Sequence, residues 1–374
     1  MKTFVFVVNN PAYFVSHRLA IGLSLLEQGH QVYVIGPGEC PDGLQEYGFK
    51  FHSVEMSRKG KNPFAELNTI WQLYRLFKSI KPDVVHLVTI KPYLYGGIAA
   101  RLARVPAVVS AVAGLGILFS QKNIKAKILR TVLFPLYWFA FNHPNQKAIF
   151  QNTHDRDVLI NWGVLSANKA VLVRGAGADL KDYAYVTEPS SVPVVSFAAR
   201  LLKDKGVVEF VNASRLLQQR KVAAKFWLIG DTDPGNANTV NQSELDAWQA
   251  EGLVECLGYR TDIASLFAQS NIVSLPSYYG EGLPKVLIEA AACGRAVVTT
   301  DWPGCRDAII ADVTGLLIPI KDSIALADAI ELLIKDAGLR NSMGREGRAL
   351  AEDVFAIEKI VQQHLDIYQE LLEG

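Results

Sequence analysis

Short, continuous runs of apolar residues, many of them β-branched, alternate with helix-patterned segments along most of this chain. Strands that are apolar on both faces are typical of a parallel sheet with helices on both sides. In the first half, the first helical stretch covers residues 16–28, and Gly29 is well placed to end it. The expected strands of this half are 4–8, 31–35, 51–54, 84–88, 107–111, 147–150 and 170–173. The alternation predicts a doubly wound α/β domain.

The pattern breaks between Arg174 and Pro193, which we interpret as a linker because small and turn-forming residues prevail there. The strands expected beyond it are 194–197, 225–229, 254–257, 272–275, 296–299 and 315–318. A chain of 374 residues is also too long for one ordinary core. We therefore predict two Rossmann-like α/β domains, residues 1–178 and 190–355, that face a central cleft. A last helix within 356–374 could cross back to the first domain.

Composition limits the partners of such a chain. The net charge is +1, so no global field favours nucleic acid, and no nucleic-acid partner is expected. The four cysteines lie far apart without metal-ligand spacing, which predicts a reducing, cytoplasmic compartment and no metal or other cofactor. Residues 1–8 are too short an apolar run for a signal peptide. The longest apolar stretch, 131–141, has eleven residues, whereas a membrane-spanning helix needs about 20.

The segment 277–289, which follows one of the strands expected in the second half, carries the strongest chemical pattern. Gly280 and Gly282 permit tight turns and a close approach of the backbone to a ligand. Pro284 suits the first position of a helix, so we expect a helix over 285–292. The carboxyl end of a strand followed by a helix start is a common place for a ligand in an α/β domain.

Backbone amides around Gly282 and Leu283, next to this helix start, suit the binding of a diphosphate. Two carboxylates flank the position, Glu281 in the loop and Glu289 further along the helix. From the residues alone, a surface turn followed by a helix with a Lys285–Glu289 ion pair explains the segment equally well.

The spacing from Glu281 to Glu289 resembles the E-x7-E signature of the retaining glycosyltransferases of family 4, which have the GT-B architecture. The resemblance implies that Glu281 contacts hydroxyls of the donor sugar and that Glu289 holds the ribose hydroxyls of the nucleotide. Residues 199–206 are similar to the family's G-R-L-x-x-x-K-G, with alanine in place of the first glycine. Arg200 and Lys205 would then place two cations on the donor diphosphate and offset the charge of the leaving group without a metal.

Two further segments, one in the linker and one in the second half, support the resemblance. Residues 174–180 are similar to the family's R-G-S-G-V-D-L linker, with two alanine changes. Tyr259 and Arg260 lie in a loop that resembles the one contacting the nucleobase in the family. The first half is less typical, because it lacks a glycine pair after the first strand and has Ala113 where many members carry a histidine. In the retaining mechanism the leaving phosphate can take the acceptor proton, so this loss does not exclude catalysis.

Segments 56–63, 81–92 and 113–116 resemble a subgroup that adds N-acetylhexosamines to sugars on a polyprenyl diphosphate, in O-antigen or N-glycan precursor assembly. The resemblance implies a UDP-sugar donor, expected to be UDP-N-acetylhexosamine, and an undecaprenyl-diphosphate-linked sugar as acceptor. The candidates for binding the lipid diphosphate or anionic headgroups are Arg58, Lys59, Lys61 and Lys91. Solvated loops explain these cations equally well.

Residues 121–141 suggest contact with a membrane surface. Four cations, Lys122, Lys125, Lys127 and Arg130, precede an aromatic-rich apolar stretch. A helix of this kind suits the headgroup region of an anionic membrane, which predicts a cytoplasmic protein peripherally associated with the inner leaflet of the plasma membrane. The alternative is a core helix with lysines that reach out to solvent.

The sequence thus predicts a retaining, UDP-sugar-dependent glycosyltransferase. One alternative is a nucleotide-sugar epimerase of the same architecture, although no convincing acid/base set is found for it. A second alternative is a nucleotide-sugar-binding protein without catalysis, which the missing histidine suggests and the intact Arg200, Lys205, Glu281 and Glu289 oppose. An NAD-dependent enzyme does not fit, because no GxGxxG follows the first expected strand.

Overall fold

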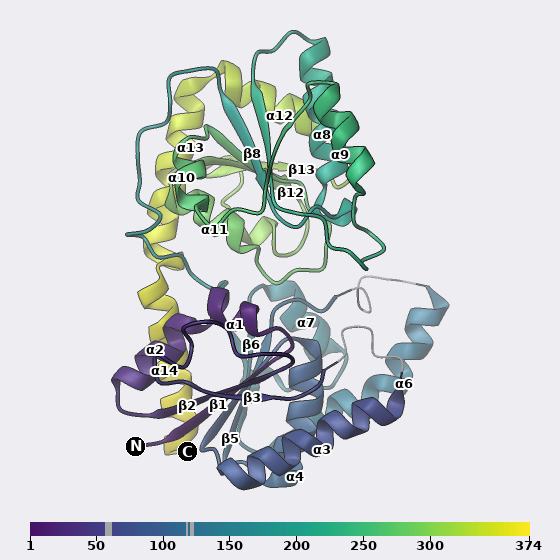
Figure 1. Ribbon diagram of the computed structural model, residues 1–374, viewed down its shortest axis with the longest axis vertical. Coiled ribbons are helices and arrows are strands. Elements are labelled where there is room, and N and C mark those ends of the chain that lie inside the picture. The colour runs from purple at the N-terminus through teal and green to yellow at the C-terminus, as the bar shows by residue number, and fades with distance from the viewer. Residues whose placement is uncertain (57–61, 117–118, 120–122) are drawn as a thin grey trace. The chain divides into compact units, whose positions relative to one another are not determined.

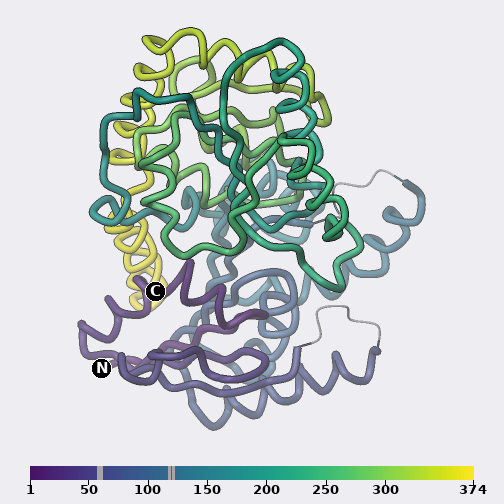
Figure 2. Tube along the Cα trace, turned by 45° about the horizontal axis from the view of Figure 1, so that its top comes forward, coloured from purple at the N-terminus to yellow at the C-terminus, as the bar shows by residue number. Residues whose placement is uncertain are grey.

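The computed structural model describes residues 1–56, 62–116, 119 and 123–374. The chain divides into two compact units, residues 1–176 with 358–374 and residues 177–357 (Figure 1). Each unit contains one parallel sheet with helices on its two faces, so the prediction of two doubly wound α/β domains is confirmed. The two ends of the chain lie near each other on the first unit in both views (Figures 1 and 2).

The first unit contains a seven-stranded sheet in the order β3-β2-β1-β4-β5-β6-β7, in which every neighbouring pair is parallel. Its strands are β1 (Thr3–Val8), β2 (Gln31–Gly36), β3 (Lys50–Ser53), β4 (Val84–Val88), β5 (Ala107–Val112), β6 (Gln146–Phe150) and β7 (Ala170–Leu172). Alternate side chains of β1 enter two different core clusters, Val5 and Val7 on one face and Phe4, Phe6 and Val8 on the other. The sheet is therefore buried on both faces, as its apolar strands predict.

Helices cover both of these faces. The helical elements of this unit are α1 (Pro11–His17), α2 (Leu19–Glu27), α3 (Pro63–Ile80), the π-helical turn η1 (Pro92–Gly96), α4 (Gly97–Ala103), α6 (Ile124–Phe141), α7 (Thr153–Asn161), the short 3-10 turn η2 (Ala167–Lys169) and α14 (Ile357–Glu373). One core cluster joins β1 to α3, α4, α6 and α7, and the other joins it to α1, α2 and α14.

The start predicted for the first helix, residue 16, is wrong. Asn10 accepts a hydrogen bond from the Ala12 amide at 3.1 Å and Pro11 occupies the first helical turn, so α1 begins at Pro11. The helix is then interrupted at Arg18, where φ is −133° and the side chain is only 2% exposed. Capping by an Asn-Pro pair and a buried arginine are features that hydrophobic periodicity does not show.

Helix α14 comes from the far end of the sequence and packs into the core of the first unit. Its residues Ile360, Ile367, Tyr368 and Leu371 belong to the same core cluster as Phe6 of β1. Two polar contacts add to this packing: His86 Nδ1 and the Tyr368 hydroxyl share a hydrogen bond of 2.5 Å, and Asn145 Nδ2 donates to the Leu371 carbonyl at 2.7 Å. Residues 358–374 thus complete a domain that the first 176 residues begin.

The second unit contains a six-stranded parallel sheet in the order β10-β9-β8-β11-β12-β13. Its strands are β8 (Val194–Ala198), β9 (Lys225–Ile229), β10 (Glu255–Gly258), β11 (Ile272–Leu275), β12 (Ala296–Thr300) and β13 (Gly315–Ile318). Its helical elements are η3 (Lys203–Lys205), α8 (Val207–Gln219), α9 (Gln242–Ala250), α10 (Ile263–Ala268), α11 (Lys285–Ala292), η4 (Arg306–Ala308), α12 (Ser323–Lys335), α13 (Ala337–Leu350) and η5 (Ala351–Phe355). One large core cluster unites this unit.

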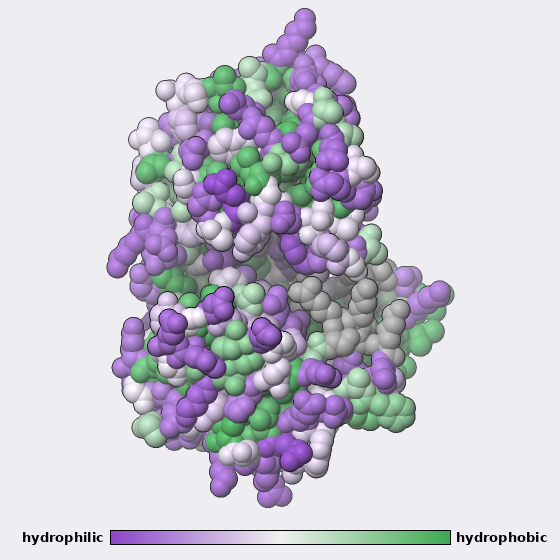
Figure 3. Space-filling model, in the orientation of Figure 1, coloured by the Kyte–Doolittle hydropathy of each residue, from purple (hydrophilic) through white to green (hydrophobic). Residues whose placement is uncertain are grey.

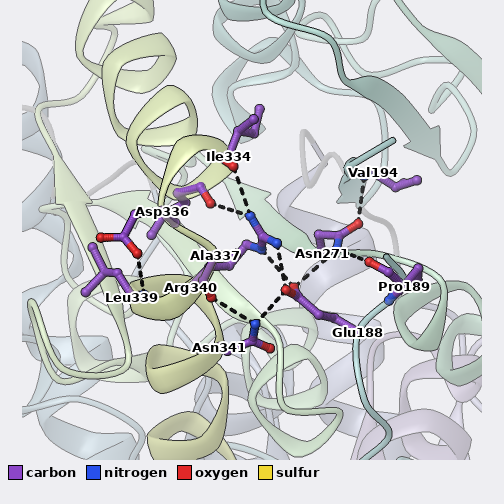
Figure 4. Close-up of polar contacts among 11 residues, drawn as sticks. Glu188, Pro189, Val194, Asn271, Ile334, Asp336, Ala337, Leu339, Arg340 and Asn341 are labelled. Atoms are coloured by element: carbon purple, nitrogen blue, oxygen red, sulfur yellow. Dashed lines mark hydrogen bonds and ion pairs between the residues drawn. The ribbon is translucent and has the colours of Figure 1, made fainter. Parts of the chain in front are cut away.

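A buried ion pair fastens the segment before β8 to this unit (Figure 4). Arg340 of α13 donates to Glu188 from Nε at 2.8 Å and from Nη2 at 2.6 Å, and its side chain is 6% exposed. Asn341 and Asn271 donate to the same carboxylate, at 2.8 and 3.2 Å. Asn271 also accepts from the Val194 amide at 3.0 Å. Because the hydrogen-bonding capacity of the Glu188 carboxylate is well used, its charge is held in a fixed place.

Candidate functional site

The candidate site lies in the second unit, at the carboxyl ends of the parallel strands. The strand order shows that the chain proceeds from β8 in one direction to β9 and β10, and in the other direction to β11 and beyond. The neighbouring strands β8 and β11 therefore define a topological switch point, where ligands bind in open α/β sheets. The loops after these two strands contain Arg200, Lys205, Glu281 and the start of α11.

The loop after β8 is shaped by close backbone contacts. The Ala199 amide donates to the Ile229 carbonyl at 3.0 Å, which keeps the loop beside the end of β9. Gly206 has φ of +81°, and a Cβ there would lie 2.2 Å from the Pro276 carbonyl oxygen. Only glycine fits this approach, so Gly206 sets the position of the preceding residue, Lys205, against the end of β11.

Lys205 and Glu281 form an ion pair across the switch point. The lysine is 8% exposed overall, and its ammonium also lies 5.2 Å from the centroid of the Tyr279 ring. Ser277 donates from its hydroxyl to the same Glu281 oxygen at 3.2 Å. Two residues that are 76 positions apart in the chain thus meet in a largely buried place. An opposite charge nearby is what makes burial of a lysine tolerable.

Arg200 takes a different partner from Lys205. Its guanidinium donates to the Asp233 carboxylate at 2.6 Å, and the Arg200 side chain is 50% exposed. Asp233 belongs to the loop after β9. The two cations predicted to act together are therefore held by different carboxylates on neighbouring loops.

Glu289 lies on the second turn of α11 and is 7% exposed. Its Oε1 atom accepts from the Tyr183 hydroxyl at 2.7 Å and lies 3.0 Å from the Lys285 ammonium. Burial, together with the Glu289 charge, raises the pKa of Tyr183 well above its usual range, so the phenol stays protonated and donates. The predicted Lys285–Glu289 pair is present, and Tyr183 from the linker joins it.

The helix start next to these carboxylates is close to the prediction. Helix α11 covers residues 285–292 as expected, but Pro284 precedes it as an extended residue with ψ of 120° instead of occupying its first turn. Leu283 is buried, and a Cβ at Gly304 would lie 2.4 Å from the Gly282 carbonyl oxygen. The turn between β11 and α11 is therefore packed tightly against the loop after β12.

The residues predicted to contact a nucleobase lie on the loop after β10. Tyr259 is 74% exposed, which leaves its ring available for stacking. Arg260 is paired with Asp262 through bonds of 2.7 and 2.5 Å, at an exposed position. These two side chains share the carboxyl edge of the sheet with Arg200 and Lys205.

The cations predicted in the first half are only partly described. Arg58, Lys59 and Lys61 lie outside the described residues. Lys91 follows the carboxyl end of β4, at the switch point between β1 and β4, and its ammonium lies 2.7 Å from Glu66 of α3. Both side chains are mostly buried, so Lys91 is charge-paired in this state. Thr89 beside it has φ of +76°, a strained conformation for a β-branched residue that is common near functional sites.

Three residues of the second unit join the predicted site through their contacts, namely Tyr183, Asp233 and Ser277. The partners of Tyr183 and Asp233 lie 106 and 33 positions away in the chain, so local sequence patterns do not reveal these pairings. The described residues include no group of three or more histidines, cysteines, aspartates or glutamates that could hold a metal ion. Within the same part of the chain, no helix is long and apolar enough to cross a membrane.

Comparison with known proteins agrees with this geometry. The family model described as "Glycosyl transferases group 1" matches residues 184–350, and the one described as "Glycosyl transferase 4-like" matches residues 5–153. The chain is 31% identical over 373 residues, 96% of either protein, to the N,N'-diacetylbacillosaminyl-diphospho-undecaprenol alpha-1,3-N-acetylgalactosaminyltransferase of Campylobacter jejuni. It is also 25% identical to the UDP-Gal:alpha-D-GlcNAc-diphosphoundecaprenol alpha-1,3-galactosyltransferase of Escherichia coli, over 82% of this chain and 80% of that protein.

Solved structures show the same fold. Sucrose-phosphate synthase from Thermosynechococcus elongatus superimposes with a TM-score of 0.80 at 19% identity and covers 100% of both chains. Anabaena Alr3699/HepE in complex with UDP gives a TM-score of 0.77 at 20% identity, over 99% of this chain and 100% of that one.

The two doubly wound units and the site at the second switch point define a GT-B glycosyltransferase. The chain belongs to the family of group 1, family 4-like glycosyltransferases, which confirms the predicted resemblance. These matches give no support to an epimerase or to a protein without catalysis.

Proposed function

We propose that the protein transfers an N-acetylhexosamine, with retention, from a UDP-sugar to a sugar linked to undecaprenyl diphosphate. The observation that carries the proposal is the Lys205–Glu281 pair at the switch point of the second unit, with Arg200 and Glu289 on neighbouring elements. The relatives named above support the substrate class, because one donates N-acetylgalactosamine and both act on sugars carried by diphospho-undecaprenol.

Arg200 and Lys205 are proposed to bind the donor diphosphate. Both are paired with carboxylates, with which a diphosphate would compete as an anion. Arg200 is half exposed and able to move to a phosphate, whereas Lys205 is confined. Cations placed on the diphosphate stabilise the charge that develops as the sugar leaves, and this requires no metal. The leaving phosphate can take the proton of the acceptor hydroxyl.

Glu281 and Glu289 are proposed to hold the two ends of the donor that lie on either side of the diphosphate. Glu281, fixed by Lys205 and Ser277, accepts from hydroxyls of the transferred sugar, and Glu289 accepts from the ribose. Gly282 and Leu283 would contribute backbone to the diphosphate, and Tyr259 and Arg260 would contact the base. Each role follows the family's pattern at the matching position.

The function is tested by a screen for UDP release over a panel of UDP-sugars, with a short polyprenyl-diphosphate-linked sugar as acceptor. UDP-N-acetylhexosamine is expected to give acceptor-dependent release and a product with the anomeric configuration of the donor. Glu281→Ala should remove transfer while the protein stays folded by circular dichroism. Wild-type turnover by this variant would refute the site, and an epimerised free sugar without acceptor would refute the reaction.

The acceptor diphosphate is proposed to bind near Arg58, Lys59, Lys61 and Lys91. Since Lys91 is paired with Glu66, we expect an arriving diphosphate to compete with that carboxylate. Lys91→Met is therefore expected to raise KM for the lipid-linked acceptor more than KM for the UDP-sugar. An unchanged acceptor KM would remove Lys91 from the proposal.

We also propose that the first unit docks peripherally on an anionic membrane through α6. The solvent-facing side of its first half is apolar, with Ile124, Ile128 and Val132 each at least 60% exposed. Lys125 and Lys127 are exposed beside them. Apolar residues gather at this projecting edge, over α6 and the start of α3 (Figure 3). An apolar stripe with lysines at its rim suits the headgroup layer of an anionic leaflet.

Helix α3 adds a second stripe of the same kind to this unit. Phe64, Leu67 and Trp71 follow a helical spacing and are 81%, 61% and 56% exposed. The exposed Arg75 and Lys78 continue this face toward the end of the helix. Flotation with liposomes tests the proposal: binding should need anionic lipid, decline with salt, and be lost in Ile128→Ser/Val132→Ser. Binding that does not depend on salt, or no binding at all, would refute the membrane-docking proposal.

A further inference from the structure

The linker between the two units is fastened to the side of α11. Arg348 of α13 donates to the Tyr183 carbonyl at 2.8 Å and to the Ala292 carbonyl at the end of α11 at 2.7 Å. Arg295 donates to the Val186 carbonyl at 2.7 Å. The Tyr183 amide donates in turn to the Asp179 carbonyl at 2.9 Å. These backbone bonds place the Tyr183 side chain independently of its hydroxyl.

The Tyr183 hydroxyl and the Lys285 ammonium both contact Oε1 of Glu289, at 2.7 and 3.0 Å. Among the described residues nothing bonds to the other oxygen, Oε2, so the second half of this carboxylate is unused. Lys285 alone would hold Glu289 weakly, because it lies on the same helix four residues away and is partly solvated. Tyr183 comes from a different segment and is half buried, so its hydrogen bond fixes the position of the Glu289 side chain.

We propose that Tyr183 is a positioning residue of the nucleotide site. Its hydroxyl occupies Oε1 and leaves Oε2 of Glu289 to accept hydrogen bonds from the ribose hydroxyls of a nucleoside diphosphate. The inference rests on the proposed function, in which Glu289 is the ribose carboxylate. A glutamate that is already oriented does not lose side-chain freedom when the nucleotide binds, so the hydrogen bond increases affinity by pre-organisation.

A simpler role for Tyr183 is to attach the linker to α11, and ribose selectivity separates the two roles. A purely structural contact supports the whole site, so its loss would weaken the binding of UDP and of 2′,3′-dideoxy-UDP equally. A positioning residue acts through the ribose, so its loss weakens the binding only of UDP, the nucleotide that carries the ribose hydroxyls.

The test compares Tyr183→Phe with Tyr185→Phe in the full chain. Tyr185 lies in the same linker and packs against Gly294, and within the described part of the chain its hydroxyl contacts no site residue, which makes it a matched control. Calorimetric titration with UDP is expected to give about 3- to 10-fold weaker binding for Tyr183→Phe, the range for the net contribution of one ordinary hydrogen bond. Binding of 2′,3′-dideoxy-UDP should not change, kcat at saturating donor should stay within about twofold, and Tyr185→Phe should match wild type.

Glu289→Ala separates the failure of this inference from the failure of the proposed function. If that variant still distinguishes UDP from 2′,3′-dideoxy-UDP as wild type does, Glu289 is not the ribose residue, and the proposed roles of Glu289 and Tyr183 both fall. If Glu289→Ala loses the distinction while Tyr183→Phe keeps wild-type affinity, only the role of Tyr183 falls. The role is supported if Tyr183→Phe has no further effect on UDP binding in the Glu289→Ala background.

Discussion

At the scale of single residues, the two cations of the candidate site differ in how they are held. Lys205 is almost fully buried beside Glu281, whereas Arg200 is half exposed beside Asp233. Removing one member of a buried pair leaves the other charge without compensation, while exposed pairs contribute little to stability. The same contrast predicts different phenotypes for two variants that both remove a positive charge.

Lys205→Met is expected to lower the free energy of unfolding by about 2–4 kcal/mol and to reduce transfer strongly. Arg200→Met should change the free energy of unfolding by less than about 1 kcal/mol and still reduce kcat/KM by about 100-fold or more, since both cations are proposed to stabilise the leaving diphosphate. Urea titration and initial rates measure the two effects. Equal stability losses would contradict the contrast in burial.

At the scale of elements, α14 is joined to β4 by a buried cluster of histidines. His86 and His364 are at most 1% exposed, their rings stack at 5.7 Å, and Arg18 is buried nearby. Burial, reinforced by the Arg18 charge, lowers the pKa of His364 to about 3. Burial, then the neighbouring His364 and Arg18, lowers the pKa of His86 well below its usual range. Both imidazoles are therefore neutral in the folded protein at pH 7.

Acid is consequently expected to weaken the docking of α14. In the unfolded chain each histidine binds a proton near pH 6.5, whereas the folded chain resists protonation down to about pH 3 at His364. The unfolded state binds more protons in this window, so stability falls as the pH falls below about 6.5, by at most about 1.4 kcal/mol per pH unit for each histidine. Unfolding midpoints between pH 8 and 5 measure the slope. His364→Leu should flatten it, and an unchanged slope would contradict the assignment.

The Glu188–Arg340 pair leads to a prediction about the stability of the segment before β8. Burial by itself would raise the pKa of Glu188, but hydrogen bonds from Arg340, Asn271 and Asn341 outweigh it and lower that pKa. Glu188→Gln leaves the Arg340 charge buried without its partner, so we expect a loss of about 3–5 kcal/mol in urea. Glu251→Gln, at the exposed pair with Arg215, is the matched control and should cost less than about 1 kcal/mol. Similar losses for both variants would show that the network is not what fastens the segment.

At the scale of the whole molecule, each unit has its own core and its own switch point. A protein of this kind does not have to unfold in one step, so a ligand that binds one unit acts first on that unit. All residues proposed to bind the donor belong to residues 177–357.

UDP is therefore expected to stabilise the second unit, without any added metal. At a UDP concentration of 100 times Kd the gain is about 2.7 kcal/mol. Hydrogen-exchange mass spectrometry should show protection in 199–206 and 277–289 with UDP in the presence of EDTA, and transfer rates should not change on adding EDTA. Protection that appears only with Mg²⁺ would contradict the proposed role of Arg200 and Lys205.

Much of the fold could be predicted because parallel strands are marked by apolar runs with clear ends. The strands at 84–88, 225–229, 272–275 and 315–318 have the predicted bounds. The position of the site followed from the rule that ligands bind at the carboxyl ends of such strands. The break at Arg18 was missed because it depends on which side chain is buried in the tertiary structure.

The pairing inside the site could not be predicted from the sequence. Nothing in the sequence shows that Lys205 takes Glu281 while Arg200 takes Asp233, because that choice depends on side-chain reach in the folded loops. The bond between Tyr183 and Glu289 is a similar case, since the sequence of the linker shows only that small and turn-forming residues prevail there. The family resemblance supplied residue roles, but these pairings are a property of this chain.

The contribution of α14 to the first unit has a consequence for synthesis on the ribosome. The hydrophobic cluster on one face of the first sheet needs Ile360, Ile367, Tyr368 and Leu371, which emerge only after residues 177–357 have been translated. The second unit is continuous in sequence and is available to fold as it appears, whereas the first must wait with one face of its sheet only partly covered, by α1 and α2. The domain that is translated first is thus the one completed last, and during that interval it is the part of the nascent chain most in need of a chaperone.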